Sequence, residues 1–92
     1  MTLLSDSEIE QRLAGSAWQR EGATIVRNWR FPNFLDAVAF VNAVADVAEA
    51  ANHHPDIFLH GWNQVRLTLS THSEGGVTES DFAAAEQIDR LS

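Results

Sequence analysis

Apolar residues recur at helical spacing in three stretches of the chain and at strand spacing between them. This pattern predicts the order helix, two strands, helix, two strands, helix. The first helix falls in residues 5–15, where Ser5 and Glu8 match a Ser-x-x-Glu capping box and Gly15 follows the last turn. Its inward-facing residues would be Ile9 and Leu13.

Residues 18–31 show the two-residue period of β-strands on either side of Gly22. We therefore expect a hairpin there. One side of its second strand would carry Ile25, Arg27, Trp29 and Phe31. Arg27 is the only charged member of that side, so it needs either an edge position or a partner for its charge.

The longest regular element begins at Phe34 and runs to about Asn52, which would end the helix much as a glycine does. The ring of Pro55 then disfavours helical geometry at His54. The expected inward stripe of this helix is Phe34, Val38, Val41, Val44 or Ala45, and Ala48. Its many alanines would let it lie close against a sheet or against a second copy of itself.

Two more strands follow, at residues 57–63 and 64–71, joined between Gly61 and Gln64. Apolar and polar residues alternate along the second of them, which predicts one buried face. Thr78 and Asp81 then fit a capping box for a final helix. Its inner residues would be Phe82, Ala85 and Ile88.

Length and composition favour a single globular domain over residues 1–92. Of the 92 residues 45% are hydrophobic, with three Trp and five Phe, enough for a core. A formal net charge of −7 disfavours nucleic-acid binding, which depends on Lys and Arg neutralising phosphates. The absence of cysteine excludes disulfides and thiolate chemistry. We see neither a signal peptide nor a membrane span, and expect a cytoplasmic protein.

Four histidines gather in residues 53–72, and two interpretations fit them. In the structural one, His53 or His54 interacts with the dipole at the helix C-terminus, worth about 0.3–1 kcal/mol, and His60 is solvated near a loop. In the functional one, the helix end and the strand end at His72 converge on one pocket. Imidazoles there could transfer protons, because their ordinary pKa of about 6.5 lies near neutral pH.

Other chemistries have weaker support in the sequence. Adjacent histidine side chains diverge, so the pair is a poor start for a metal site. No Cys and no Gly-x-Ser-x-Gly elbow supplies a nucleophile, and SEGG lacks the pattern of a phosphate loop. Asp81 has a structural reading as the acid of the capping box. Glu49 could orient His53 by an i, i+4 contact or could be solvated.

Several of these segments together resemble the signature of the pterin-4a-carbinolamine dehydratases. They are EAANHHP at residues 49–55, Trp62, TLSTH at residues 68–72 and Asp81. The resemblance extends through Trp18 and FPNF at residues 31–34 to nearly the whole chain. One departure is Asn52, where an aspartate commonly precedes the histidine pair.

The resemblance implies an α+β fold, a four-stranded antiparallel sheet with three helices packed on one face, assembled as a homodimer or homotetramer. It also implies a hydro-lyase that dehydrates 4a-hydroxytetrahydrobiopterin to the quinonoid dihydropterin in tetrahydrobiopterin recycling. No metal or organic cofactor is implied. The alternative function is that of a non-catalytic binding, assembly or transcriptional cofactor module, with a protein partner, on the same fold.

The same resemblance implies the site residues. His53 and His72 would be acids on either side of the pterin, and His54 would orient its ring. Further substrate contacts would come from Pro55, Thr71, Ser73 and Glu74. Glu49 and Asp81 would support the histidines.

Overall fold

Four antiparallel strands form one open sheet in the computed structural model, which describes residues 2–92. The strands lie in the order β1-β2-β4-β3. Their bounds are Gln19–Glu21 for β1, Thr24–Arg30 for β2, Asp56–His60 for β3 and Gln64–Leu69 for β4. The helices are α1 (Asp6–Leu13), α2 (Phe34–Ala51) and α3 (Glu79–Asp89), with a short 3-10 helix η1 at His72–Glu74. The expected order of elements and the expected fold class are confirmed.

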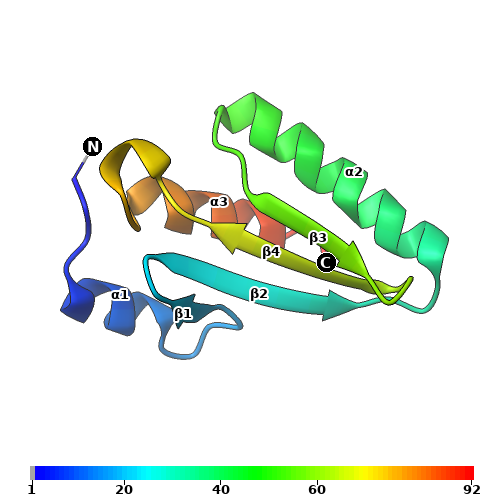
Figure 1. Ribbon diagram of the computed structural model, residues 1–92, viewed down its shortest axis with the longest axis horizontal. Coiled ribbons are helices and arrows are strands. Elements are labelled where there is room, and N and C mark those ends of the chain that lie inside the picture. Colours follow the sequence, from blue (N-terminus) through cyan, green and yellow to red (C-terminus); the bar gives the residue numbers. More distant parts are fainter. Residues whose placement is uncertain (1) are drawn as a thin grey trace.

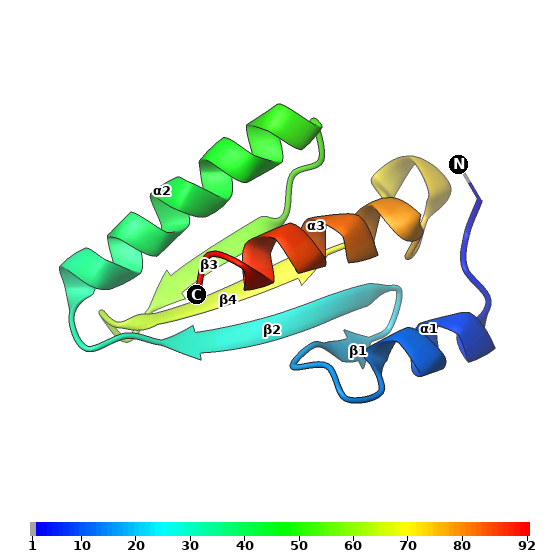
Figure 2. The same cartoon turned by 180° about the vertical axis from the view of Figure 1, so that it is seen from behind.

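The helices cover one face of the sheet. Figure 1 shows α3 behind the strands, and Figure 2, seen from the other side, shows it in front of them with α1 beside β1. Alternate side chains of β2 and β4 face this layer and pack with residues from the helices. Buried members of the core include Ile9, Trp18, Ile25, Trp29, Phe40, Val44, Val65, Leu67, Leu69 and Ile88.

Each helix begins with a side-chain cap, and those of α1 and α3 are the capping boxes that the sequence predicts. Ser5 and Glu8 form a capping box at α1, and Thr78 and Asp81 form one at α3. The Asn33 side chain accepts a hydrogen bond from the backbone of Asp36 at the start of α2. At α1, the backbone N–H and the hydroxyl of Ser5 lower the pKa of Glu8.

The face of α2 that packs on the core differs in part from the one expected. Its buried residues are Ala37, Phe40, Val44 and Ala48. The expected stripe is right for Ala48 and wrong for Phe34, which is 50% exposed. Of the two alternatives Val44 and Ala45, Val44 is buried and Ala45 is exposed. Val41 is partly buried against the core. Apolar residues occur on more than one side of this helix, so its periodicity alone did not select the side.

Within residues 2–92, no helix combines the length and apolar character needed to cross a membrane.

The charge of Arg27 is met by Asp89 at the end of α3. The guanidinium of Arg27 lies 2.5 Å from Oδ1 of Asp89 and 4.5 Å from the ring centroid of Trp29. The same carboxylate oxygen accepts a hydrogen bond of 2.8 Å from the indole N–H of Trp18, a residue only 3% exposed. The expectation that Arg27 has a partner is confirmed. Asp89 thereby ties β2, α3 and the segment before β1 together.

Substituting Asp89 with Ala should lower the free energy of unfolding by about 1–3 kcal/mol, because the Trp18 indole N–H loses its acceptor and Arg27 loses its countercharge. Urea unfolding followed by tryptophan fluorescence measures the loss. The matched control is Asp46→Ala, which removes an exposed acid of α2 and should change the unfolding free energy by less than about 0.5 kcal/mol. Equal losses in the two variants would contradict this account of Asp89.

Candidate functional site

The sheet topology brings the histidine pair and the end of β4 to the same place. Asp56 at the start of β3 pairs with Thr68 near the end of β4. Because the two strands are antiparallel, the chain before β3 and the chain after β4 lie at one end of the sheet. His53 belongs to the first of these segments and Thr71 to the second.

His53 is held in place by the way α2 ends. Asn52 takes the left-handed conformation expected of it, with φ 50°. The next backbone N–H, that of His53, returns to the carbonyl of Ala48 at 3.1 Å. This bond fixes the backbone of His53 against the last turn of the helix, and its side chain, 16% exposed, points toward the start of α3.

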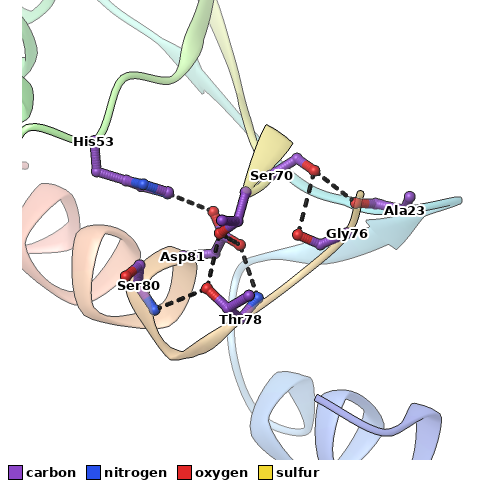
Figure 3. A network of polar contacts seen from close by, with 8 residues as sticks. Ala23, His53, Ser70, Gly76, Thr78, Ser80 and Asp81 are labelled. Carbon is purple, nitrogen blue, oxygen red and sulfur yellow. Dashed lines mark hydrogen bonds and ion pairs between the residues drawn. The ribbon is translucent and has the colours of Figure 1, made fainter. Parts of the chain in front are cut away.

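Asp81 is the partner of His53. Nε2 of His53 lies 2.6 Å from Oδ1 of Asp81, whose side chain has no exposed surface (Figure 3). The other oxygen, Oδ2, accepts 2.9 Å hydrogen bonds from the backbone N–H of Thr78 and from the hydroxyl of Thr71. The carboxylate therefore serves the capping box of α3 and contacts the histidine at the same time.

The two threonines complete this cluster. Their hydroxyl oxygens lie 2.7 Å apart, and that of Thr78 also accepts from the backbone N–H of Ser80. Thr71 follows β4, Thr78 and Asp81 begin α3, and His53 follows α2. One buried carboxylate thus connects three elements. The sequence indicated Thr78 only as a cap; its spacing to Asp81 gave no sign that the same acid would reach a histidine.

His54 points to a different partner from its neighbour. Its Nε2 lies 2.6 Å from Oε1 of Glu49, and both side chains are more than half exposed, at 55% and 78%. The suggested i, i+4 contact of Glu49 with His53 is therefore wrong. His53 lies in a buried cluster and His54 on the surface, as the divergence of adjacent side chains leads one to expect.

His72 begins η1 directly after Thr71, and His72 and Ser73 are exposed while Glu74 is partly buried. Gly75 closes this turn with φ 73°, and Thr71 and Gly76 pair as an isolated bridge. His72 therefore directly follows Thr71, whose hydroxyl donates a hydrogen bond to Asp81. The structure therefore brings the His53 and His72 segments to one cluster through Asp81 and Thr71.

Two other features lie apart from this cluster. His60 is partly buried on β3, where its ring stacks on Phe58 at 4.6 Å between centroids, so it is not simply solvated. A shallow hollow of about 340 Å³ lies between α2 and the C-terminal residues; its lining consists of Phe31, Asp36, Ala39, Phe40, Ala43 and Leu91. Across residues 2–92, no three His, Asp or Glu side chains are grouped as metal ligands would be.

The arrangement is suited to proton transfer. A histidine whose one ring nitrogen contacts a carboxylate can give or accept a proton through the other, while the carboxylate fixes the ring orientation. Such a pair supplies general acid or base catalysis without a nucleophile.

The family model of pterin 4 alpha carbinolamine dehydratase matches residues 2–91. A protein of Roseiflexus sp. (strain RS-1), provisionally named a pterin-4-alpha-carbinolamine dehydratase, is 50% identical over 91 residues, covering 98% of this chain and 97% of its own. A protein of Chloroflexus aurantiacus (strain ATCC 29366 / DSM 635 / J-10-fl) with the same provisional name is 51% identical over 92 residues, covering 99% and 98%.

Two solved structures share the fold. A transcriptional coactivator/pterin dehydratase from Brucella melitensis superposes with a TM-score of 0.90 at 35% identity, over 98% of both chains. A pterin dehydratase-like protein, described as a RuBisCO assembly factor in the alpha-carboxysome, superposes with a TM-score of 0.66 at 25% identity, over 80% of this chain and 84% of its own.

Substituting Asp81 with Ala should lower the free energy of unfolding by about 2–4 kcal/mol, because the Thr78 N–H and the Thr71 hydroxyl lose their acceptor inside the protein. Chemical unfolding measures this. Glu49→Ala is the matched control: it removes an exposed carboxylate that also contacts a histidine, and should change stability by less than about 1 kcal/mol. A loss at Asp81 no larger than at Glu49 would contradict the structural role of the buried cluster.

Proposed function

The chain belongs to the pterin 4 alpha carbinolamine dehydratase family, and on that premise we propose that it is a hydro-lyase acting on a 4a-hydroxytetrahydropterin. Its product would be the quinonoid dihydropterin, as in tetrahydrobiopterin recycling. The observation that carries this proposal is the 2.6 Å contact between His53 and the buried Asp81. That contact holds the imidazole of His53 in a fixed orientation, close to the segment that carries His72. We also propose that residues 1–92 act as one domain.

The reaction requires an acid and a base. The C–O bond at the 4a carbon breaks, and the hydroxyl takes up a proton and leaves as water. The neighbouring ring nitrogen loses its proton, and the electrons of that N–H bond form the new C=N bond. One proton is given and one is taken, so the overall step is neutral and suits imidazole side chains.

The residues divide these tasks. His53 and His72 act as the acids near the hydroxyl. The imidazole that gives its proton to the hydroxyl is left neutral and takes the proton of the ring nitrogen. His54 orients the pterin ring, with Glu49 as its partner. Pro55, Ser73 and Glu74 form the remaining contacts to the substrate. Asp81 acts through His53 and does not touch the substrate, because its side chain has no exposed surface.

A spectrophotometric dehydration assay tests the activity and the roles together. The wild-type protein should accelerate the loss of water over the rate in buffer. The double variant His53→Ala, His72→Ala should lose about 10²–10⁴ in kcat, the usual contribution of general acid–base catalysis.

The matched control is His60→Ala, since His60 lies on β3 against Phe58 and away from the cluster. It should keep the wild-type rate. A wild-type protein that gives no acceleration would overturn the proposed activity. An active wild type with an equally active double variant would overturn only the assigned roles.

We further propose that the protein assembles as a homodimer or homotetramer. β3 lies at an edge of the sheet, and its Ile57 and Phe58 are 39% and 58% exposed. Leu35 on α2 is 76% exposed. Unpaired strand edges and exposed apolar side chains are typical of interaction surfaces.

Light scattering after size-exclusion chromatography measures the assembly. The wild-type protein should have at least twice the mass of one chain, and Ile57→Glu should shift it toward the monomer by placing a charge at the strand edge. Leu3→Glu is the matched control, because Leu3 is an apolar residue, 47% exposed, that belongs to no strand, and its substitution should leave the mass unchanged. A monomeric wild type would refute the proposed assembly.

A second candidate function is that of a protein-binding module. It is favoured by the same exposed apolar residues and by the assembly and coactivator roles named for the two solved relatives. Calorimetry separates the candidates: an enzyme should bind a dihydropterin. A stoichiometric protein partner together with no pterin binding would favour the module.

A further inference from the structure

His53 has two ring nitrogens, and the contacts around it distinguish them. We infer that Nε2 carries the proton of the neutral ring and that Nδ1 is the atom that exchanges a proton with the substrate. The part that concerns the substrate rests on the proposed function. The part that concerns the ring itself rests only on the hydrogen bonds of Asp81.

The Oδ2 side of Asp81 faces donors. A backbone N–H can only donate, so the 2.9 Å contact with Thr78 N requires a lone pair on Oδ2. The Thr71 hydroxyl, also at 2.9 Å, donates to the same oxygen. Two donors on Oδ2 leave no room for a proton there.

The Oδ1 side faces His53 alone among these partners, at 2.6 Å. A contact this short needs one proton between the two atoms. The two hydrogen bonds that Oδ2 accepts favour the carboxylate form of Asp81, so that proton belongs to the nitrogen. His53 therefore donates through Nε2, and its neutral form has an unprotonated Nδ1.

Nδ1 makes no hydrogen bond to any part of the chain in residues 2–92. The side chain of His53 keeps 16% of its surface exposed, so the ring is reachable from outside while its other nitrogen is anchored. A nitrogen that is unpartnered, oriented and accessible is what a proton-transfer group requires.

This assignment changes the role of Thr71. Its single hydroxyl proton is directed to Asp81, and its oxygen lies 2.7 Å from that of Thr78. The hydroxyl is therefore engaged on the protein side and is not available to the substrate. Thr71 is a positioning residue that acts through Asp81 on His53, in contrast to the substrate contact implied by the resemblance.

Asp81→Asn tests the assignment with almost no change of shape. The amide must turn its carbonyl oxygen to the Thr78 N–H and the Thr71 hydroxyl, because its NH₂ group cannot accept from them. The NH₂ group then faces His53 and donates to Nε2. The neutral ring should change from the Nε2–H to the Nδ1–H tautomer, while the cap of α3 is preserved.

Nitrogen-15 NMR of the substrate-free protein, at a pH of about 9 where imidazoles are neutral, reads the tautomer directly. His53→Ala identifies the resonances of His53 by their loss. We expect Nε2–H in the wild type and Nδ1–H in Asp81→Asn. The latter should also lose about 10²–10⁴ in kcat, as when a catalytic imidazole is held in the wrong tautomer.

Thr71→Val removes the hydroxyl and keeps the shape, and Thr71→Ser is its matched control. The valine variant should lower kcat about 3- to 10-fold, as expected for one hydrogen bond, with KM unchanged. The serine variant should restore kcat. If Thr71 contacted the substrate through its hydroxyl, KM would rise instead, and the positioning role would be wrong.

The outcomes separate the two levels of the proposal. A wild-type His53 with Nδ1–H, or an Asp81→Asn protein with the wild-type tautomer, overturns the inference. If Asp81→Asn does not fold, the wild-type tautomer and the Thr71 pair still decide it. The expected tautomers in a protein that does not dehydrate pterins would overturn the proposed function and uphold the proton assignment on the ring.

Discussion

The structure depends on satisfying one carboxylate that water does not reach. An ionised group inside a protein is costly unless hydrogen bonds replace its hydration, and Asp81 accepts from His53, Thr71 and Thr78. These partners come from the ends of α2 and β4 and from the start of α3. The candidate site is therefore not an addition to a finished fold. Bringing these three segments together both completes the fold and orients the histidine.

Features set by local sequence were predictable. Both capping boxes, the left-handed Asn52 and the order of elements follow from short-range patterns, and the structure has them. The buried face of α2 was not predictable from periodicity, since Phe34 and Phe40 are equally apolar and only the position of the sheet buries Phe40. The partner of Glu49 was missed for a related reason. The helix ends before His53, so i, i+4 spacing no longer describes which side chain Glu49 meets.

The two interpretations of Asp81 turn out to be compatible. A capping box uses one oxygen of its acid, and a carboxylate has two. Helix capping was predicted from the spacing of Thr78 and Asp81, and support of a histidine was implied by the family resemblance. In the structure, Oδ2 binds the cap and Oδ1 contacts His53. The cap fixes the position of the carboxylate, and a fixed carboxylate can orient an imidazole more tightly than a solvated one can.

The adjacent histidines differ because their carboxylate partners differ in burial. The buried Asp81 restricts His53, whereas His54 and its partner Glu49 are both more than half exposed, at 55% and 78%. An exposed ion pair of this kind contributes little to stability, so rearranging His54 around a ligand costs little. Moving His53 would leave the buried carboxylate with an unmet contact. The restricted ring thus suits the proton transfer proposed for His53, which needs fixed geometry, and the exposed ring can adjust to a ligand, as the role proposed for His54 requires.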